Sequence, residues 1–367
     1  MKKLNIAIFD MDSLKNPYWG AGQARATREV SKRLAKKHKI TVYCSKYPGA
    51  KDYKEDNISY KHIGLTSSSP ILTNLSFLFS IPLVARNVKA DIIVENFNAP
   101  TSVSFAPLFT KVPVVGLPTM FNAKEFSKKY HLPFDWVEKI GFRFYKYLLP
   151  YSETDSSKAK KLNPSIVYKI VPQGVDESFL KIKHKKGKYI LFLGRFDIWQ
   201  KGIDLLLNSY AKVAKKINYP LVLAGHGPDE GKIKDLIKKL KLEDKVSIIG
   251  PSYGKKKVQL IQEALFVAFP SRHDEMSLWT LEALASGLPL VAFDLPESRW
   301  MDGRVSLKAK QFSLTDFGKK MLEATEKKIN KAMRKEARIF AKSFSWEKVA
   351  AEYDSFFKYV IQKEAQS

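Results

Sequence analysis

Two carboxylates and the start of a helix follow an apolar run in the second half of the chain. Ala264–Phe269 predicts a buried strand, and leucines at near-helical spacing predict a helix over about 277–286. Asp274 lies in the loop between them, and Glu282 lies inside the helix. The first turn of a helix has unpaired N–H groups and the positive end of the dipole, so it can hold an anion. The spacing suits a sugar–diphosphate–nucleoside, with the sugar at Asp274, the diphosphate at the helix start and the ribose at Glu282.

The same stretch also fits a simpler interpretation. An ordinary strand–loop–helix unit of a parallel sheet, with acids that face water, has the same pattern. This stretch alone does not decide between the two interpretations.

Strand and helix patterns alternate along the chain, and the alternation restarts near residue 189. In the first half we expect strands at 4–9, 40–44, 58–63, 91–95, 112–117 and 166–171, with helices at 24–37, 71–86, 101–109 and 135–147. In the second half we expect strands at 189–193, 221–224, 246–249, 264–269 and 290–293, with helices at 203–216, 231–240, 255–264, 277–286 and 346–362. Such alternation predicts parallel sheets flanked by helices, so the fold class is α/β with two Rossmann-like domains facing a cleft. We expect one domain at 1–180, with the helical segment 346–367 packing back on it, and the other at 181–345.

Short motifs in the second half resemble those of one enzyme family. The motifs occur in the family's order and at its intervals: Gly194-Arg195, Lys201-Gly202, Gly225-His-Gly-Pro228, Ile249-Gly250, Pro270-Ser-Arg272, Asp274 to Glu282-Ala283, Gly287-Leu-Pro289 and Val291–Asp294. Pro172–Asp176 resembles the family's interdomain segment, and Phe344-Ser-Trp346 resembles the entry to its C-terminal helix. The chain thus resembles the retaining glycosyltransferases of family 4 (group 1), which have the GT-B fold.

The resemblance implies roles for individual residues. Arg195 and Lys201 would bind the donor diphosphate, Asp274 the donor sugar and Glu282 the ribose, and these four form the expected catalytic set. Further donor contacts would come from Gly20, Gly22, Gly194, Gly225, Gly250, Met276, Ser277 and Leu278. Charge develops on the diphosphate as the glycosidic bond breaks, and fixed cations beside it would stabilise that transition state. We therefore expect transfer without a metal ion or cofactor.

The chain departs from the family pattern in two places. Asp274 stands where the family usually has Glu, and Glu275-Met-Ser277 replaces Gly-Phe-Gly, so the donor sugar is not fixed by the motif. Many members carry a histidine after the strand that here ends at Leu117, whereas this chain reads Pro118-Thr-Met-Phe-Asn122. A catalytic base is therefore not assigned, and Thr119 and Asn122 are named as acceptor contacts.

Asp10-Met-Asp12 follows the first strand and supports an alternative. The run Ile8–Leu14 resembles the first motif of haloacid-dehalogenase-type phosphatases, in which the first Asp attacks phosphate and the second is the acid/base. Ser13-Leu14 replaces the usual Gly-Thr, and short motifs often match by chance. In the glycosyltransferase interpretation, Asp10 and Asp12 would instead contact acceptor hydroxyls.

Composition narrows the class of partner. The 367 residues include 63 basic and 37 acidic residues, for a formal net charge of +26, which favours anionic partners. We find no zinc-finger spacing or RNA-binding signature, so a nucleic acid partner is not expected. The one cysteine, Cys44, fits a reducing compartment. Prolines interrupt the apolar segment 63–85, so we expect a buried helix over 71–86 that could also lie in a membrane interface.

Together these features predict a cytoplasmic enzyme that moves a hexose from a UDP- or GDP-sugar to a glycan or lipid-linked acceptor bound by the first domain. Its basic surface would place it at the inner face of an anionic membrane. The alternatives are the phosphatase and a non-catalytic binder of sugar nucleotides. The sequence leaves open the nucleotide, the sugar, the linkage, the acceptor and the oligomeric state.

Overall fold

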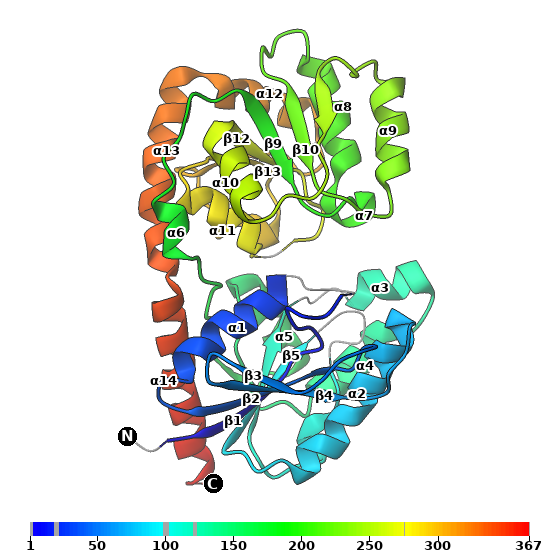
Figure 1. The fold of residues 1–367 in the computed structure, drawn as a ribbon, viewed down its shortest axis with the longest axis vertical. Coiled ribbons are helices and arrows are strands. Elements are labelled where there is room, and N and C mark those ends of the chain that lie inside the picture. The colour runs from blue at the N-terminus through cyan, green and yellow to red at the C-terminus, as the bar shows by residue number, and fades with distance from the viewer. Residues whose placement is uncertain (1–2, 18–21, 98–102, 120–122, 275, 367) are drawn as a thin grey trace. The chain divides into compact units, whose positions relative to one another are not determined.

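Two compact units make up the protein. The computed structural model describes residues 3–17, 22–97, 103–119, 123–274 and 276–366. Unit 1 comprises residues 1–173 with 346–367, and unit 2 comprises residues 174–345 (Figure 1). The division therefore falls at residue 173, whereas the sequence analysis placed it after residue 180.

Backbone contacts explain where the division lies. The Val175 N–H donates to the Phe344 carbonyl (2.7 Å), and helix α6 (Glu177–Leu180) packs on helix α11 (Leu278–Ala285). The Lys185 N–H donates to the carbonyl of Gln262 (2.8 Å). The run 174–188, which includes the basic segment 181–188, is thus part of unit 2.

Unit 1 is built on a sheet that is parallel except at one edge. Its strand order is β3-β4-β2-β1-β5-β6-β7-β8, and only β3 runs antiparallel to its neighbour. The strands are β1 (Asn5–Phe9), β2 (Lys39–Ser45), β3 (Tyr53–Glu55), β4 (Ile58–Ile63), β5 (Ile92–Phe97), β6 (Val114–Pro118), β7 (Tyr147–Leu148) and β8 (Val167–Tyr168). The order reverses between β1 and β5, which makes the carboxyl ends of these two strands the switch point where open α/β sheets bind ligands.

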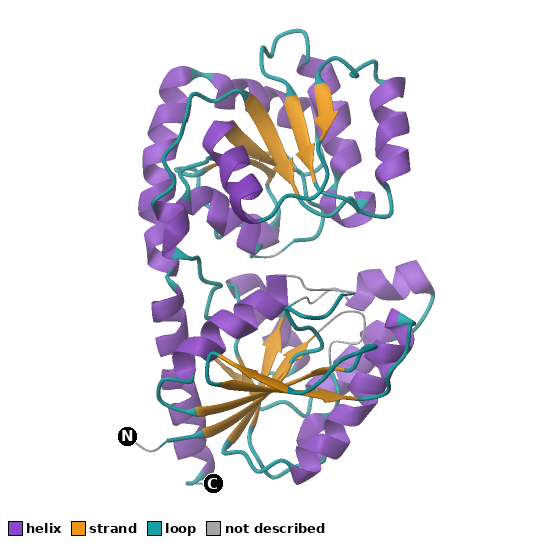
Figure 2. Cartoon of the chain, in the orientation of Figure 1, coloured by secondary structure: helices purple, strands orange, loops and turns teal. Residues whose placement is uncertain are grey.

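Helices cover both faces of this sheet (Figures 1 and 2). They are α1 (Gly22–Leu34), α2 (Pro70–Asn87), the 3₁₀ turn η1 (Ala106–Leu108), α3 (Ala123–Tyr130), α4 (Phe134–Phe142), α5 (Glu153–Leu162) and α14 (Trp346–Glu364). Right-handed crossovers place α1 and α2 on opposite faces. Phe77 and Ile81 of α2 pack on Phe9 and Phe97 of the sheet and on Phe142 of α4 in one buried cluster.

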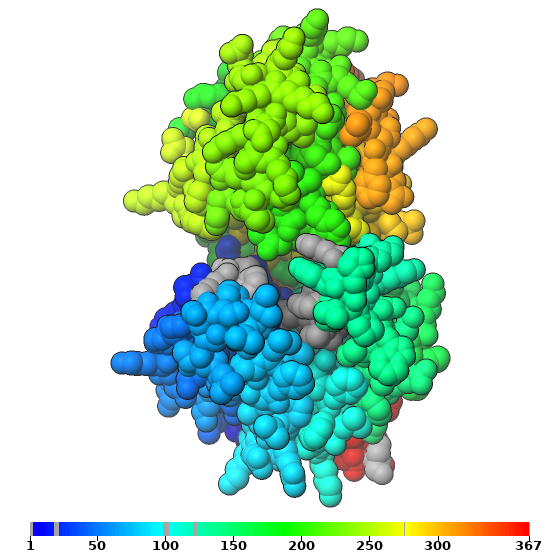
Figure 3. All heavy atoms as spheres, turned by 90° about the vertical axis from the view of Figure 1, so that its right-hand side faces the viewer, coloured from blue at the N-terminus to red at the C-terminus, as the bar shows by residue number. Residues whose placement is uncertain are grey.

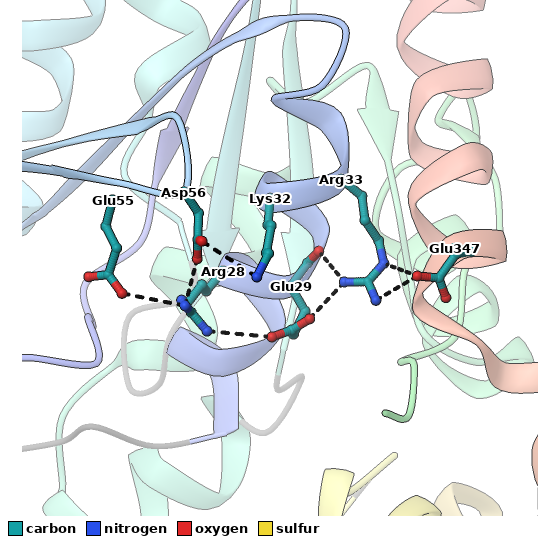
Figure 4. Close-up of polar contacts among 7 residues, drawn as sticks. All are labelled: Arg28, Glu29, Lys32, Arg33, Glu55, Asp56 and Glu347. Atoms are coloured by element: carbon teal, nitrogen blue, oxygen red, sulfur yellow. Dashed lines mark hydrogen bonds and ion pairs between the residues drawn. The ribbon is translucent and has the colours of Figure 1, made fainter. Parts of the chain in front are cut away.

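The C-terminal helix α14 lies against α1, as predicted. Trp346 is buried, and the His38 ring joins Asp354 of α14 at 2.9 Å. Because Nδ1 of His38 accepts from the Leu4 N–H, Nε2 carries the proton that it donates to Asp354. A row of largely part-buried ion pairs continues across α1 from Asp56 to Glu347 (Figure 4). The buried apolar side chains of α14 also hold the helix in place.

Unit 2 contains a parallel sheet of order β11-β10-β9-β12-β13-β14 in its described residues. The strands are β9 (Tyr189–Leu193), β10 (Leu221–Ala224), β11 (Val246–Ile248), β12 (Ala264–Phe269), β13 (Leu290–Phe293) and β14 (Ser306–Ala309). The helices are α6 and α11 as above, with α7 (Ile198–Lys201), α8 (Ile203–Val213), α9 (Glu230–Lys239), α10 (Gly254–Glu263), η2 (Pro296–Ser298), α12 (Leu314–Thr325), α13 (Lys327–Ala341) and η3 (Lys342–Phe344). Side chains of α8, α9 and α12 form one buried cluster with the strands, and α11 packs on α13.

Two helix predictions were wrong in unit 1. The helix expected at 101–109 is only the turn η1 within the described residues, because Phe105 has a left-handed φ of 63° and Pro107 follows. The helix expected at 135–147 ends at Phe142, and Tyr147 belongs to strand β7, where it pairs with β6. Across the described ranges of the chain, no helix combines the length and apolarity needed to cross a membrane.

Candidate active site

The carboxyl ends of β9 and β12 meet at the centre of the sheet of unit 2. β9 pairs with both β10 and β12, and the chain leaves β9 and β12 in opposite directions across the sheet, which makes this edge a switch point. Arg195 follows β9 and Asp274 follows β12. The fold thus brings the loops that carry these predicted residues to one edge.

Arg195 reaches toward the neighbouring loop while staying accessible to solvent. Its side chain is 54% exposed and lies 3.3 Å from Asp197. Its Nη2 also donates to Oε1 of Gln200 (2.9 Å). The Nε2 of Gln200 in turn donates to the carbonyl of His273, next to Asp274. Gln200, which the sequence analysis did not name, therefore connects Arg195 to the loop after β12.

Lys201 and Asp274 form an ion pair, and both side chains are largely buried. Lys201 ends the short helix α7, whose first residues are capped by the side chain of Asp197. Gly202 follows with φ 63°, and a Cβ there would lie 2.2 Å from the Pro270 carbonyl oxygen. Only glycine fits this turn, which is why the Lys-Gly pair brings α7 so close to the loop after β12.

The loop after β12 is held by further contacts with α7 and α8. Arg272 makes a two-pronged pair with Asp204 of α8, with N···O distances of 2.8 and 2.7 Å. It also donates to the carbonyl of Ile198 (2.7 Å). Ser271 donates to the carbonyl of Gln200 (3.1 Å). These contacts fix the backbone that carries Asp274.

Helix α11 begins immediately after this loop. Ser277 is its N-cap residue and has an extended backbone, but its side chain makes no capping hydrogen bond. The Thr280 N–H donates to the Ser277 carbonyl (3.1 Å). The N–H groups of Leu278 and Trp279 come before any carbonyl that the helix could offer them, and they lie at the positive end of its dipole. Met276, which was expected to contact the donor, is buried. An anion could therefore lie at this helix start.

Glu282 is buried inside α11 and paired with Lys257 of α10. The residue is 3% exposed, and the ammonium group of Lys257 contacts its Oε2. The same ammonium lies 5.1 Å from the Trp279 ring centre and 5.6 Å from that of Phe179, which suits cation–π contacts. Lys257 was not predicted from the sequence, because it lies in a lysine run that reads as a solvated helix face.

The glycines predicted to contact the donor differ in how closely other atoms approach them. Gly225 has φ 152°, and a Cβ there would lie 1.9 Å from the Gly194 carbonyl oxygen, so packing explains this glycine. Gly250 has φ 71° in open space, and Gly22 is the first residue of α1. Gly20 lies outside the described residues.

In unit 1, Asp10 and Asp12 lie at the carboxyl end of β1. Asp10 is fully buried and accepts a hydrogen bond from the Thr27 hydroxyl, and the Asp12 N–H donates to it (3.1 Å). Burial raises the pKa of Asp10 to about 7. Asp12 accepts from the Ser13 N–H (2.8 Å). Asp10 presents no exposed oxygen to a phosphate ester, so this geometry gives the phosphatase alternative no support.

The other predicted acceptor contacts lie near β6. The Thr119 hydroxyl donates to the Phe97 carbonyl, and Asn122 lies outside the described residues. A second buried acid, Glu95 on β5, was missed by the sequence analysis. It accepts from the Tyr145 hydroxyl (2.6 Å) and the Ser104 N–H (2.9 Å), and burial raises its pKa to about 7. No group of three potential metal-ligating side chains occurs in the described part of the chain.

Sequence comparison matches two family models to consecutive parts of the chain. The model described as Glycosyltransferase Family 4 matches residues 20–179, and the one described as Glycosyl transferases group 1 matches residues 175–299. Two uncharacterized glycosyltransferases of Methanocaldococcus jannaschii are similar to this chain. One is 36% identical over a region that covers 28% of this chain and 26% of its own length. The other is 25% identical over a region that covers 55% of this chain and 60% of its own length. An N-acetylgalactosaminyltransferase of Campylobacter jejuni, named for a diphospho-undecaprenol-linked acceptor, is 30% identical over 45% of each chain. The matched region thus spans less than two thirds of these relatives.

Solved structures share the fold over the whole chain. Sucrose-phosphate synthase from Thermosynechococcus elongatus has a TM-score of 0.79 at 15% identity and covers 100% of both chains. HepE of Anabaena, solved with UDP and glucose, has a TM-score of 0.75 at 14% identity and covers 97% of this chain and 100% of its own. These similarities identify the fold as that of the GT-B glycosyltransferases. With the two family matches, they show that the chain belongs to the group 1 glycosyltransferases of family 4.

Proposed function

We propose that this protein is a glycosyltransferase that takes a hexose from a UDP- or GDP-sugar and retains the configuration of the transferred carbon. The observation that carries the proposal is the cluster at the β9–β12 edge, where Arg195, Lys201 and Asp274 are linked through Gln200 beside the start of α11. The family membership and the UDP in the HepE structure support a nucleotide-sugar donor.

The proposed chemistry follows from where positive charge lies. As the bond to the sugar breaks, negative charge grows on the leaving diphosphate, and preorganised donors stabilise that charge. Arg195 is exposed enough to reach a phosphate, and the ammonium of Lys201 has three donors, so it can bind a phosphate oxygen while it keeps Asp274. The N–H groups that open α11 add a third source of positive charge.

Glu282 would accept hydrogen bonds from the ribose hydroxyls. Lys257 holds one of its oxygens, so the ion pair fixes the direction of the carboxylate. Asp274 would accept from the sugar hydroxyls, its own position fixed by Lys201. Because two side-chain cations and a helix start supply the charge, we propose transfer without a metal, and activity should persist in excess EDTA.

We propose a glycan or lipid-linked acceptor that binds unit 1 near the β1–β5 switch point, beside Asp12 and Thr119. Asp10, which was expected to contact the acceptor, is fully buried and presents no oxygen to it. The name of the Campylobacter relative, which acts on a diphospho-undecaprenol-linked acceptor, supports a lipid-linked one.

A thermal-shift screen with UDP-, GDP- and ADP-sugars tests the donor proposal, because a ligand that binds only the folded state raises the melting temperature. One of these donors should stabilise the wild type, and Lys201→Ala should lose that shift. Lys215→Ala, at an exposed lysine beyond α8, is the matched control and should keep it. An equal shift in Lys201→Ala, or no shift with any donor at millimolar concentration, would overturn the proposal.

A further inference from the structure

Helix α2 of unit 1 is apolar on both of its faces. Its inner stripe, at four-residue intervals, consists of Thr73, Phe77, Ile81 and Ala85, and all four are buried. Its outer stripe should be polar if it only met water. Instead it carries five large apolar side chains that are 41–74% exposed, here called the α2 patch: Ile71, Leu72, Leu75, Phe79 and Leu83.

Neighbouring structure extends the α2 patch. The turn η1 packs against α2, and Leu108 and Phe109 in and after it are 55% and 46% exposed. Helix α2 lies on the surface in Figure 3, as the light blue side chains of unit 1. Scattered exposed leucines are ordinary, but a row of large apolar side chains along one helix marks an interaction surface.

The two segments that carry the α2 patch have charges of one sign. No acidic residue occurs from 57 to 90 or from 96 to 124, the two segments that build this surface. Arg86 and Lys89 follow the outer stripe, Lys111 follows η1, and all three are exposed. Within the described ranges, none of the three makes an ion pair with another residue. An apolar row followed along the chain by exposed cations is complementary to an anionic, apolar partner.

We infer that the α2 patch docks unit 1 onto the surface of an anionic lipid bilayer. The apolar side chains would enter the boundary between headgroups and acyl chains, and Arg86, Lys89 and Lys111 would contact the phosphates. Docking of this kind is independent of the proposed transfer reaction, since it concerns a different face and needs no donor.

Flotation with vesicles of phosphatidylglycerol and phosphatidylcholine, or of phosphatidylcholine alone, tests this inference. The full chain should float with the anionic vesicles and much less with the neutral ones. Phe79→Ser with Leu83→Ser should weaken binding at least about tenfold, because it removes two large apolar side chains from the membrane boundary. Arg86→Glu with Lys89→Glu should weaken it at least about tenfold as well, because two cations that would contact the phosphates are replaced by anions.

Matched variants on unit 2 distinguish binding through the α2 patch from nonspecific binding to vesicles. Ile339→Ser and Lys331→Glu alter an exposed apolar and an exposed basic residue of α13 and should leave flotation unchanged. All of these positions are exposed, so the variants should keep the wild-type melting temperature. Absence of flotation with anionic vesicles, or equal flotation by Phe79→Ser/Leu83→Ser, would overturn the inference. So would a wild-type dimer in light scattering that this double variant makes monomeric, because the occupant would then be a second copy.

Discussion

The ion pair between Lys257 and Glu282 offers the sharpest test of how the candidate site is built. The side chain of Glu282 is 4% exposed and that of Lys257 is 16% exposed. Lys257→Met keeps most of the volume of the lysine stem but leaves a carboxylate in a buried position without its cation. Breaking a buried pair in this way costs roughly 3–5 kcal/mol.

Substitution of the other partner, Glu282, should lower the free energy of unfolding by less. In Glu282→Gln the lysine keeps its partial access to water and its place over the Trp279 ring, so we expect a loss of about 1–2 kcal/mol. In the double variant neither charge remains, and the total should fall short of the sum by roughly 1–3 kcal/mol. Unit 2 has about 170 residues, for which about 1 kcal/mol shifts the melting temperature by roughly 2–4 °C. Lys257→Met should therefore lower it by about 6–20 °C.

Urea and thermal unfolding, followed by tryptophan fluorescence, measure these values. Lys234→Met is the matched control: it breaks the pair with Glu230 on α9, whose side chains are 57% and 36% exposed. An exposed pair of this kind contributes at most about 1 kcal/mol. Lys257→Met could lower the free energy of unfolding no more than Lys234→Met does, or the losses of Lys257→Met and Glu282→Gln could add in the double variant. Either result would mean that the ion pair does not organise the site.

Three further outcomes are expected. The raised pKa of Glu95, about 7, means that the folded state holds a proton that the unfolded chain releases near pH 4.5, so stability should fall by as much as ~3 kcal/mol as pH rises from about 4 to 7. Urea titrations of Glu95→Gln should show a flatter pH dependence, and an unchanged slope would contradict the assignment. Gly202→Ala should destabilise unit 2 because of its positive φ and a 2.2 Å contact, whereas Gly231→Ala, in open space on α9, should stabilise it by up to about 1 kcal/mol in the same melting assay. Asp274→Asn releases Lys201 from its ion pair, so calorimetry should show roughly fivefold tighter binding of the nucleoside diphosphate, a gain of about 1 kcal/mol, and no gain would count against Lys201 as a phosphate ligand.

The central strands of unit 2 could be predicted to the residue. β9, β10, β12 and β13 have the bounds that the sequence indicated, because strands covered by helices on both faces are continuous apolar runs. β7 could not be found in the same way. It has two residues and follows a helix of similar apolarity, so only its pairing with β6 identifies Tyr147 as part of a strand.

The candidate site shows the same limit. Arg195 and Asp274 could be named because each follows a strand in a recognisable motif. Gln200 and Lys257 could not, since their importance depends on which residue each one meets across the fold. Lys257 is the third of three consecutive lysines on α10, and nothing in that run distinguishes the one that turns inward to Glu282.

These contacts change what the two acids can do. Each acid assigned to the donor is already neutralised by a lysine, so the acids and their lysines add no net charge to the edge of the sheet. Selectivity for a diphosphate must then come from Arg195, from the helix start at Leu278, and from the spare donors of Lys201. The pairing also fixes the direction of each carboxylate before a ligand arrives, which lowers the entropy lost when sugar hydroxyls bind. A site of this kind recognises its donor by the placement of hydrogen-bond partners more than by an excess of positive charge, although the chain as a whole is strongly basic.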